Sequence, residues 1–81
     1  MLKIYGDMQC PDCQKCREDL DRANVEYEYL DFSASLRNLK AFLSIRDSSE
    51  AFCQVREMGS IGIPCIQRED GTITLSWEEF I

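Results

Sequence analysis

The sequence predicts an α/β fold that forms a single domain over the full 81 residues, with the element order β-α-β-α-β-β-α. Three observations predict it. Strand-like apolar runs open the chain and recur at residues 25–29 and 61–68. A helical repeat of apolar residues follows Pro11, and the dipeptide Asp70-Gly71 is a strong signal for a two-residue hairpin turn.

The first half of the chain alternates strand and helix. Residues 2–6 are predicted to form a short buried strand, and Pro11 fits the first position of a helix, where its missing N–H costs nothing. An apolar stripe follows at helical spacing: Cys13, Cys16, Leu20 and Ala23. Asn24 is expected to end this helix. Residues 25–29 alternate apolar side chains with glutamate, which predicts a strand with one face in water.

Residues 33–58 have helical periodicity, and we expect two helices joined at a kink. The first has a stripe of leucines that we expect to face the core: Leu36, Leu39 and Leu43. Asp47 begins a sequence that resembles a capping box. A second stripe, which we expect to end at Gly59, follows at Phe52, Val55 and Met58.

The last quarter of the chain is predicted to be an antiparallel hairpin followed by a short helix. Residues 61–68 and 72–75 are expected to pair around the turn, in a register that sets Ile66 opposite Leu75. The terminal helix is expected to cover the core with three apolar side chains: Trp77, Phe80 and Ile81.

Charge and composition exclude several classes of function. Acidic residues outnumber basic ones by 15 to 9, and the net charge is −6. Nucleic acids and anionic membranes both need a cationic face, so we expect neither as a partner. The acidic surface favours a soluble monomer. The first residues contain no apolar stretch long enough for a signal peptide or a membrane span, which predicts a cytoplasmic protein.

The chain has five cysteines and no histidine. In the cytoplasm, closely spaced cysteines indicate catalysis or metal binding rather than a structural disulfide. Within the stretch GDMQCPDCQKC, the cysteines at positions 10, 13 and 16 stand three apart. This spacing leaves two alternatives open, which are a redox pair with a third thiol beside it and a thiolate metal site.

The redox alternative follows from the predicted position of Cys10 at the start of a helix. Unpaired backbone N–H groups and the positive end of the helix dipole stabilise a thiolate there. Cys13 comes one turn later and can resolve a mixed disulfide on Cys10. Asp12 opposes the thiolate through like-charge repulsion. The predicted catalytic residues are therefore Cys10 as nucleophile and Cys13 as resolving thiol, with Pro11 fixing the entry to the helix.

The metal alternative is a zinc or iron–sulfur module whose four thiolates come from Cys10, Cys13, Cys16 and Cys65. Helical geometry argues against it, since Cys10 and Cys16 would point roughly 120° apart around the helix. We favour core packing for Cys16, with an accessory thiol as the other possibility. For Cys65, packing and an accessory role stay equally open, and Cys53 is expected to be structural or at the surface. We predict no bound metal.

At this point the chain resembles the glutaredoxin branch of the thioredoxin-like superfamily, and most closely the small glutaredoxin-related proteins of bacteria. The likeness covers the whole chain and rests on the element order and two motifs: Cys10-Pro11-Asp12-Cys13 and Ile63-Pro64. It implies a thioredoxin-like fold, in which helices flank a mixed four-stranded sheet. It also implies a cis peptide before Pro64 that faces the cysteine pair, and a backbone at Ile63 that pairs with an extended substrate.

The resemblance further implies a thiol-disulfide oxidoreductase that reduces protein or glutathione mixed disulfides. Glutathione or a reductase would supply the electrons, and no cofactor would be bound. The chain departs from the family pattern at several positions. Asp12 replaces the usual aromatic residue, and residues 7–9 lack the lysine that many members use to bind glutathione. The sequence LSWEEF stands where the family has a Gly-Gly turn followed by an acidic residue.

Overall fold

The computed structural model describes residues 1–48 and 62–81. In this part of the chain the elements are β1 (Leu2–Gly6), α1 (Pro11–Arg22), β2 (Tyr27–Asp31), α2 (Leu36–Ser48), β3 (Cys65–Gln67), β4 (Ile73–Thr74) and the short 3-10 helix η2 (Trp77–Phe80). The strands form one four-stranded sheet in the order β2-β1-β3-β4. β1 runs parallel to β2 and antiparallel to β3, so the sheet is mixed. The predicted α/β class and the mixed four-stranded sheet are confirmed.

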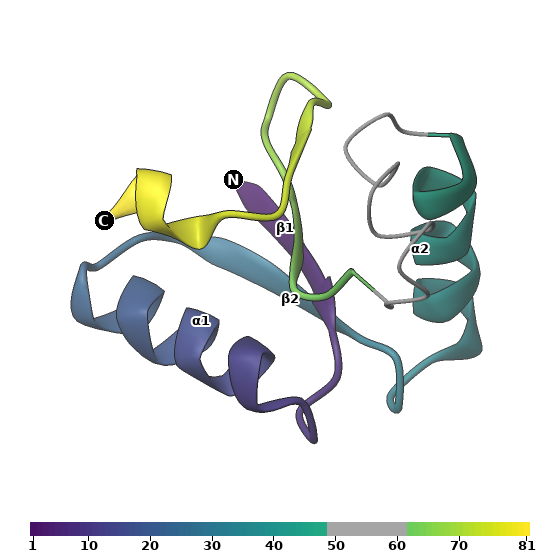
Figure 1. The fold of residues 1–81 in the computed structure, drawn as a ribbon, viewed down its shortest axis with the longest axis horizontal. Coiled ribbons are helices and arrows are strands. Elements are labelled where there is room, and N and C mark those ends of the chain that lie inside the picture. The colour runs from purple at the N-terminus through teal and green to yellow at the C-terminus, as the bar shows by residue number, and fades with distance from the viewer. Residues whose placement is uncertain (49–61) are drawn as a thin grey trace.

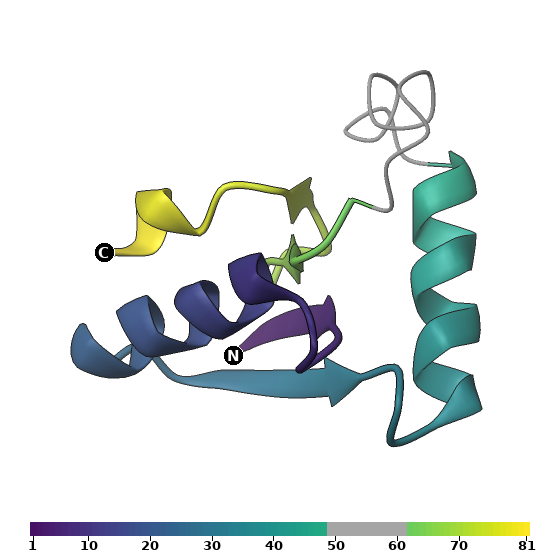
Figure 2. The same ribbon diagram turned by 60° about the horizontal axis from the view of Figure 1, so that its bottom comes forward.

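The central strand β1 divides the core into two clusters, because successive side chains of a strand point to opposite faces. Ile4 is fully buried on the α1 side, where it packs with Cys16, Leu20 and Ile66. The next residue, Tyr5, is 6% exposed and belongs to the cluster on the α2 side. Figures 1 and 2 show α1 and α2 on opposite sides of the sheet.

Helix α1 begins and packs as the sequence predicts. Pro11 occupies its first position, and three members of the predicted stripe are fully buried: Cys13, Cys16 and Leu20. The helix ends at Arg22, and Asn24 has a positive φ of 59°. Ala23 is exposed, contrary to expectation, because the helix has ended before this residue and its side chain no longer follows the stripe.

Strand β2 begins two residues later than predicted, at Tyr27. The N–H of Val25 instead donates to the carbonyl of Leu20, in the connection from α1 (2.9 Å). The face that carries Glu28 is less open to water than the alternation suggests. Glu28 is exposed, but Leu30 on the same face packs in the cluster beneath α2. Helix α2 therefore covers one end of the predicted wet face.

The buried face of α2 differs from the leucine stripe that we expected. Leu36 and Leu43 are 65% and 41% exposed, whereas Phe42 is fully buried. The Phe42 ring lies 4.9 Å from that of Phe32 and 6.5 Å from that of Tyr5, measured between centroids. Because of this aromatic packing, the face of α2 that carries Phe42 packs against the sheet in place of the face that carries Leu36 and Leu43. Asp47 does not begin a second helix after a kink as predicted, because α2 continues through it to Ser48. The stripe from Phe52 to Met58 and the end at Gly59 lie outside the described residues, as does Cys53.

The hairpin exists, but the predicted strand lengths and register are wrong. β3 begins at Cys65, because the preceding proline has no N–H for a sheet ladder. Ile66 pairs with Thr74 rather than Leu75. The N–H of Arg68 donates to the carbonyl of Thr72 (2.8 Å), so the loop holds three residues rather than two. Gly71 takes the left-handed conformation (φ 90°) that three-residue loops favour at their last position.

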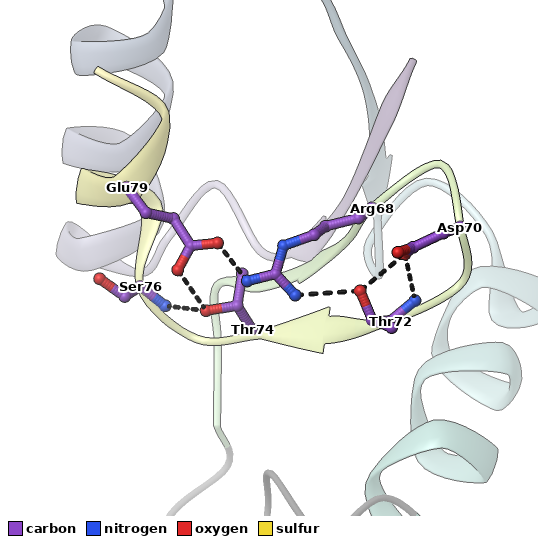
Figure 3. A network of polar contacts seen from close by, with 6 residues as sticks. All are labelled: Arg68, Asp70, Thr72, Thr74, Ser76 and Glu79. Atoms are coloured by element: carbon purple, nitrogen blue, oxygen red, sulfur yellow. Dashed lines mark hydrogen bonds and ion pairs between the residues drawn. The ribbon is translucent and has the colours of Figure 1, made fainter.

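Polar contacts fasten the C-terminal residues to the rest of the fold. The Arg68 guanidinium donates to Thr72 Oγ1 (3.0 Å) and forms an ion pair with Glu79 of η2. Figure 3 shows how these contacts continue through the side chains or backbone of Asp70, Thr74 and Ser76. Trp77 Nε1 donates to Asp19 Oδ2 on α1 (2.9 Å). These contacts hold η2 across the end of the α1-side core.

The expected covering of the core by the terminal residues is confirmed for two of the three side chains. Trp77 and Phe80 pack against the α1-side cluster, while Ile81 is 58% exposed. Among the helices in the described ranges, none has both the length and the apolar character needed to cross a membrane.

Candidate functional site

The candidate site lies where β1 passes into α1. The loop between them turns at Asp7, whose carbonyl accepts a hydrogen bond from the N–H of Cys10 (3.0 Å) and whose Oδ1 accepts one from the N–H of Gln9 (2.8 Å). The Gln14 N–H then donates to the carbonyl of Cys10 (3.1 Å), which is the first hydrogen bond of the helix. Cys10 is therefore the N-cap residue, with extended dihedral angles of φ −82° and ψ 122°.

Cys10 is partly exposed and stands at the end of the helix where backbone N–H groups lack helical partners. Its side chain makes no capping hydrogen bond within the described part of the chain. The thiol is thus both open to an incoming molecule and close to the positive end of the α1 dipole. This is the environment in which cysteine acts as a nucleophile.

Cys13 lies one turn along α1 and is fully buried. Burial raises the pKa of its thiol to about 11. The backbone at Asp7 and the hydroxyl of Tyr29 act in the opposite direction by hydrogen bonding, and the Cys10 side chain raises the pKa further. The structure thus brings the side chains of Cys10 and Cys13 together, one accessible and one enclosed. Both are free thiols.

Gly6, the last residue of β1, makes room for the buried thiol. A Cβ built on Gly6 would stand 2.7 Å from the Cys13 sulfur and 2.9 Å from the Tyr29 hydroxyl oxygen. Any side chain at this position would therefore collide with both groups. The close approach of the strand end to the helix depends on glycine for this reason.

Arg17 brings a positive charge to the same region. Its guanidinium carbon lies 4.4 Å from the centroid of the Tyr29 ring, and its Nε donates to the hydroxyl of Tyr27 (3.4 Å). The Tyr27 hydroxyl in turn donates to Asp21 (2.8 Å). Arg17 also contacts the sulfur of Met8 in the loop.

Sequence reasoning missed Gly6 and Tyr29 as members of this site. The period-two pattern of residues 25–29 correctly placed the tyrosines on one face of a strand. That pattern does not show which tyrosine lies near the cysteines. The position of Tyr29 near Cys13 depends on the parallel register, in which Ile4 of β1 pairs with Tyr29 of β2.

The remaining described cysteines lie in different surroundings. Cys16 is fully buried in the α1-side cluster, where burial chiefly raises its pKa to about 12. Cys65 is fully buried on the other face of the sheet, with Tyr5 and Phe42, and burial raises its pKa to about 12 as well. Core packing is thus the role that the structure supports for Cys16. Cys65 packs in the α2-side cluster, whereas Cys16 packs in the α1-side cluster, so core packing is also the role that these contacts favour for Cys65.

Metal-ligating groups are not gathered at the site. In residues 1–48 and 62–81, no three or more side chains of histidine, cysteine, aspartate or glutamate lie close enough together to hold a metal ion. The four-sulfur arrangement considered from the sequence fails because Cys65 faces the α2 side of the sheet while Cys16 faces the α1 side.

The predicted substrate-binding residues lie around the same end of the sheet. Tyr5 pairs with Cys65 in the β1–β3 ladder. Gly6 follows Tyr5 and Pro64 precedes Cys65, so both lie at the same end of these two antiparallel strands. Pro64 is buried and the Ile63–Pro64 peptide is cis, as expected. In both views the segment that enters β3 passes the amino-terminal turn of α1 (Figures 1 and 2).

The other two predicted substrate-binding residues, Ile63 and Pro11, differ in exposure. The side chain of Ile63 is half-buried and packs in the α2-side cluster. Pro11 is exposed beside Cys10.

Over 66 residues the chain is 38% identical to an uncharacterized protein of Haemophilus influenzae, a stretch that covers 82% of this chain and 77% of that protein. No family model matches the sequence. No solved structure matches it either.

Proposed function

We propose that this chain, which belongs to the same family as the Haemophilus influenzae protein, is a thiol-disulfide oxidoreductase of the glutaredoxin type. The thioredoxin-like architecture is part of this proposal. It is supported by the mixed four-stranded sheet, the helices on its two faces and the dithiol at the start of α1.

One observation carries the proposal, and it is the asymmetry of the two neighbouring thiols. Cys10 is partly exposed at the N-cap of α1, whereas Cys13 is fully buried and interacts with the Cys10 side chain. A disulfide substrate therefore meets Cys10 first. Cys13 is shielded from solvent and available only to a sulfur already bonded to Cys10. This division of labour is what a nucleophile and a resolving thiol require.

In the first step, the Cys10 thiolate attacks one sulfur of a substrate disulfide. A bond forms between Cys10 and that sulfur, the substrate S–S bond breaks, and the second substrate sulfur leaves as a thiolate that takes up a proton from solvent. The attack takes place at the start of α1, where the backbone N–H groups of the first turn lack helical partners.

In the second step, Cys13 loses its proton and attacks the Cys10 sulfur. The Cys10–Cys13 disulfide forms, and the bond between Cys10 and the substrate breaks. The remaining substrate sulfur leaves as a thiolate and is protonated. Counted from the two thiols, with the proton of Cys10 released to solvent before the attack, the protein has lost two electrons and two protons and the substrate has gained the same number. Two molecules of glutathione, oxidised to their disulfide, or a dithiol reductase would restore the two thiols.

The substrates that suit this site are disulfides in proteins and mixed disulfides with glutathione. Pro11 directly follows Cys10, Pro64 carries a cis peptide just before β3, and the backbone at Ile63 would pair with an extended substrate segment. The proposal needs no bound cofactor or metal. We propose that the protein acts as a monomer in the cytoplasm, where reduced cysteines are the rule.

The metal-binding alternative lacks a comparable observation in its favour. It needs Cys65 beside the α1 cysteines, and Cys65 packs with Tyr5 and Phe42 on the opposite face of the sheet. Cys16 points into the core with Leu20. We therefore rank it second.

A redox titration tests the proposed function. The protein is equilibrated in buffers of stepped reduced-to-oxidised glutathione ratio, and the Cys10–Cys13 disulfide is quantified by mass spectrometry. We expect a two-electron couple in the wild type that disappears in Cys13→Ser, which traps only a mixed disulfide with glutathione on Cys10. Cys65→Ser is the matched control, because it removes another fully buried thiol yet should leave the couple in place.

Two outcomes would overturn the proposal. One is a couple that survives in Cys13→Ser. The other is about one zinc ion per chain, bound with Cys16 among its ligands, as a structural thiolate site requires.

A further inference from the structure

The hydroxyl of Tyr29 is a buried polar group that the proposed reaction has not yet used. Tyr29 comes from β2, and its ring packs against the α1-side cluster beneath the Arg17 guanidinium. Its oxygen and the Cys13 sulfur lie 2.9 and 2.7 Å from one point, the position of a Cβ on Gly6. The phenol oxygen and the buried thiol therefore lie on the same side of the end of β1, beside Gly6.

The Tyr29 hydroxyl is unsatisfied in the resting dithiol. Its oxygen is buried and has no regular hydrogen-bond partner among the residues that the structure describes. Tyr27, two residues earlier on the same face, contrasts with it, because its hydroxyl donates to Asp21 (2.8 Å). A buried hydroxyl without a partner costs stability, so its persistence calls for a reason.

We propose that Tyr29 is a catalytic residue of the resolving step, in which its hydroxyl donates a hydrogen bond to the Cys13 sulfur as that sulfur becomes a thiolate. This inference rests on the proposed function and adds a third group to it. The unsatisfied hydroxyl gains its partner only when negative charge develops on Cys13.

The surroundings of Cys13 explain why such a donor is needed. Burial disfavours the thiolate, and the Tyr29 hydroxyl opposes this by lowering the pKa of Cys13. Burial also raises the pKa of Tyr29 itself, so the phenol stays protonated and acts as a donor rather than a base. The proton of Cys13 passes to solvent or to the leaving substrate thiolate. The new S–S bond then forms at the expense of the bond between Cys10 and the substrate.

The ionisation of Cys13 depends on groups from each element packed against it. The titratable and charged groups near Cys13 and the Tyr29 hydroxyl are Cys10, Cys16 and Arg17 from α1, Tyr29 from β2, and Asp31 at its end. Among these side chains, Tyr29 is the one whose hydrogen bonding favours the thiolate of Cys13 and lowers its pKa.

Stopped-flow reduction of dithionitrobenzoate separates the two chemical steps. With protein in excess, Cys10 releases the first nitrothiobenzoate, and attack by Cys13 on the resulting mixed disulfide releases the second. In Tyr29→Phe, loss of the hydrogen bond should raise the pKa of Cys13 by about one unit. The thiolate fraction then falls tenfold while its nucleophilicity rises, so we expect the second phase to slow by about threefold.

The first phase reports on Cys10 alone and should be unchanged in Tyr29→Phe, which also shows that the site is intact. The pH profile of the second phase should move to higher pH. Tyr27→Phe is the matched control, because it removes a hydroxyl from the same face of β2 that bonds to Asp21 instead of Cys13. We expect both of its phases to match those of the wild type.

The outcomes distinguish this inference from the proposed function. A wild type that releases both chromophores, with a Tyr29→Phe variant whose second phase and pH profile are unaltered, overturns the role of Tyr29 and leaves the function standing. A wild type that never releases the second chromophore overturns the proposed function and the inference together. Equal slowing in Tyr29→Phe and Tyr27→Phe overturns the inference, since it indicates a general loss of packing.

Discussion

Gly6 lies so close to Cys13 that a Cβ on the glycine would stand 2.7 Å from the cysteine sulfur. The end of the central strand β1 thus packs directly against the buried thiol of Cys13. On the other side of that thiol, the first turn of α1 carries Cys10. A strand that ended in any larger residue would force the helix and its two cysteines away from the sheet.

The first prediction is that Gly6→Ala damages both stability and the resolving step. The added methyl group overlaps the Cys13 sulfur and the Tyr29 hydroxyl, and such overpacking costs about 1–3 kcal/mol. Urea unfolding should show this loss, and stopped-flow kinetics should show a slower second phase. Gly71→Ala serves as the control, because a Cβ there has nothing within 4 Å and only its positive φ is strained.

Gly71→Ala should lower stability by about 1 kcal/mol and leave both kinetic phases alone. If Gly6→Ala unfolds and reacts like the wild type, the close approach of β1 to Cys13 is incorrect.

The second prediction concerns the order in which the thiols react with iodoacetamide in the native protein. Cys10 is partly exposed, whereas Cys13, Cys16 and Cys65 are fully buried. Buried thiols react only when the structure opens, so Cys10 should be alkylated at least about tenfold faster than these three. Peptide mass spectrometry after timed quenching measures each site, and unfolding in urea should remove the difference. Equal native rates at Cys10 and Cys13 would contradict the asymmetry on which the proposed function depends.

The third prediction is a loss of stability at alkaline pH. Burial raises the pKa of Cys65 to about 12 in the folded protein, from an ordinary value of 9.0. Above pH 9 the unfolded chain therefore releases a proton that the folded chain retains, and stability falls until the pH reaches the folded pKa. Between about pH 8 and pH 10 this thiol alone should cost about 1.4 kcal/mol.

Urea unfolding of the wild type and Cys65→Ala at both pH values isolates this contribution, since the other titrating groups are common to the two proteins. Between pH 8 and pH 10, the free energy of unfolding of Cys65→Ala should fall less than that of the wild type, by about 1.4 kcal/mol. Parallel losses in the two proteins would show that Cys65 is not shielded from water.

The fourth prediction concerns the contact between Asp19 and Trp77 that holds η2 on α1. The Trp77 N–H is the main cause that lowers the pKa of Asp19 from its ordinary 3.8. A lowered pKa stabilises the fold above the ordinary value, and this stabilisation is lost as the pH falls through the folded pKa. The single tryptophan of the chain should therefore report undocking of η2 by a red shift of its fluorescence in acid.

Two variants sharpen this prediction. Asp19→Asn keeps an oxygen that can accept from Trp77, so the acid-dependent shift should disappear while the neutral spectrum stays the same. Asp19→Ala should show the shifted spectrum already at neutral pH. An acid shift that persists in Asp19→Asn would assign it to another group.

Much of the candidate site was predictable because its pieces are local. Pro11 marks a helix start, and the spacing of Cys13, Cys16 and Leu20 defines one helical face, so the position of Cys10 at the N-cap follows from neighbouring residues alone. The hairpin was predictable for the same reason, although its register was not. A loop of two or three residues changes which side chains face each other, and Gly71 serves either loop.

The contacts between distant segments were not predictable in this way. Helix α2 carries two apolar stripes of helical spacing, and the sequence offers no reason to prefer Phe42 over Leu36 and Leu43. The choice is made by the aromatic rings of Tyr5 and Phe32, which pack against the ring of Phe42 between the helix and the sheet. Cys65 likewise follows Pro64 directly, and its assignment to the α2 side depends on the phase of a strand that begins one residue later than the proline.

The sequence by itself determined the order of the elements, the start of α1 and the pairing of an outer with an inner thiol. Each of these follows from backbone geometry acting over a few neighbouring residues. Only the tertiary structure decided that Gly6 and Tyr29 meet Cys13 and that Cys65 packs on the α2 side. Those outcomes depend on strand register and on competition between apolar faces of similar strength, which are settled by packing across the whole core.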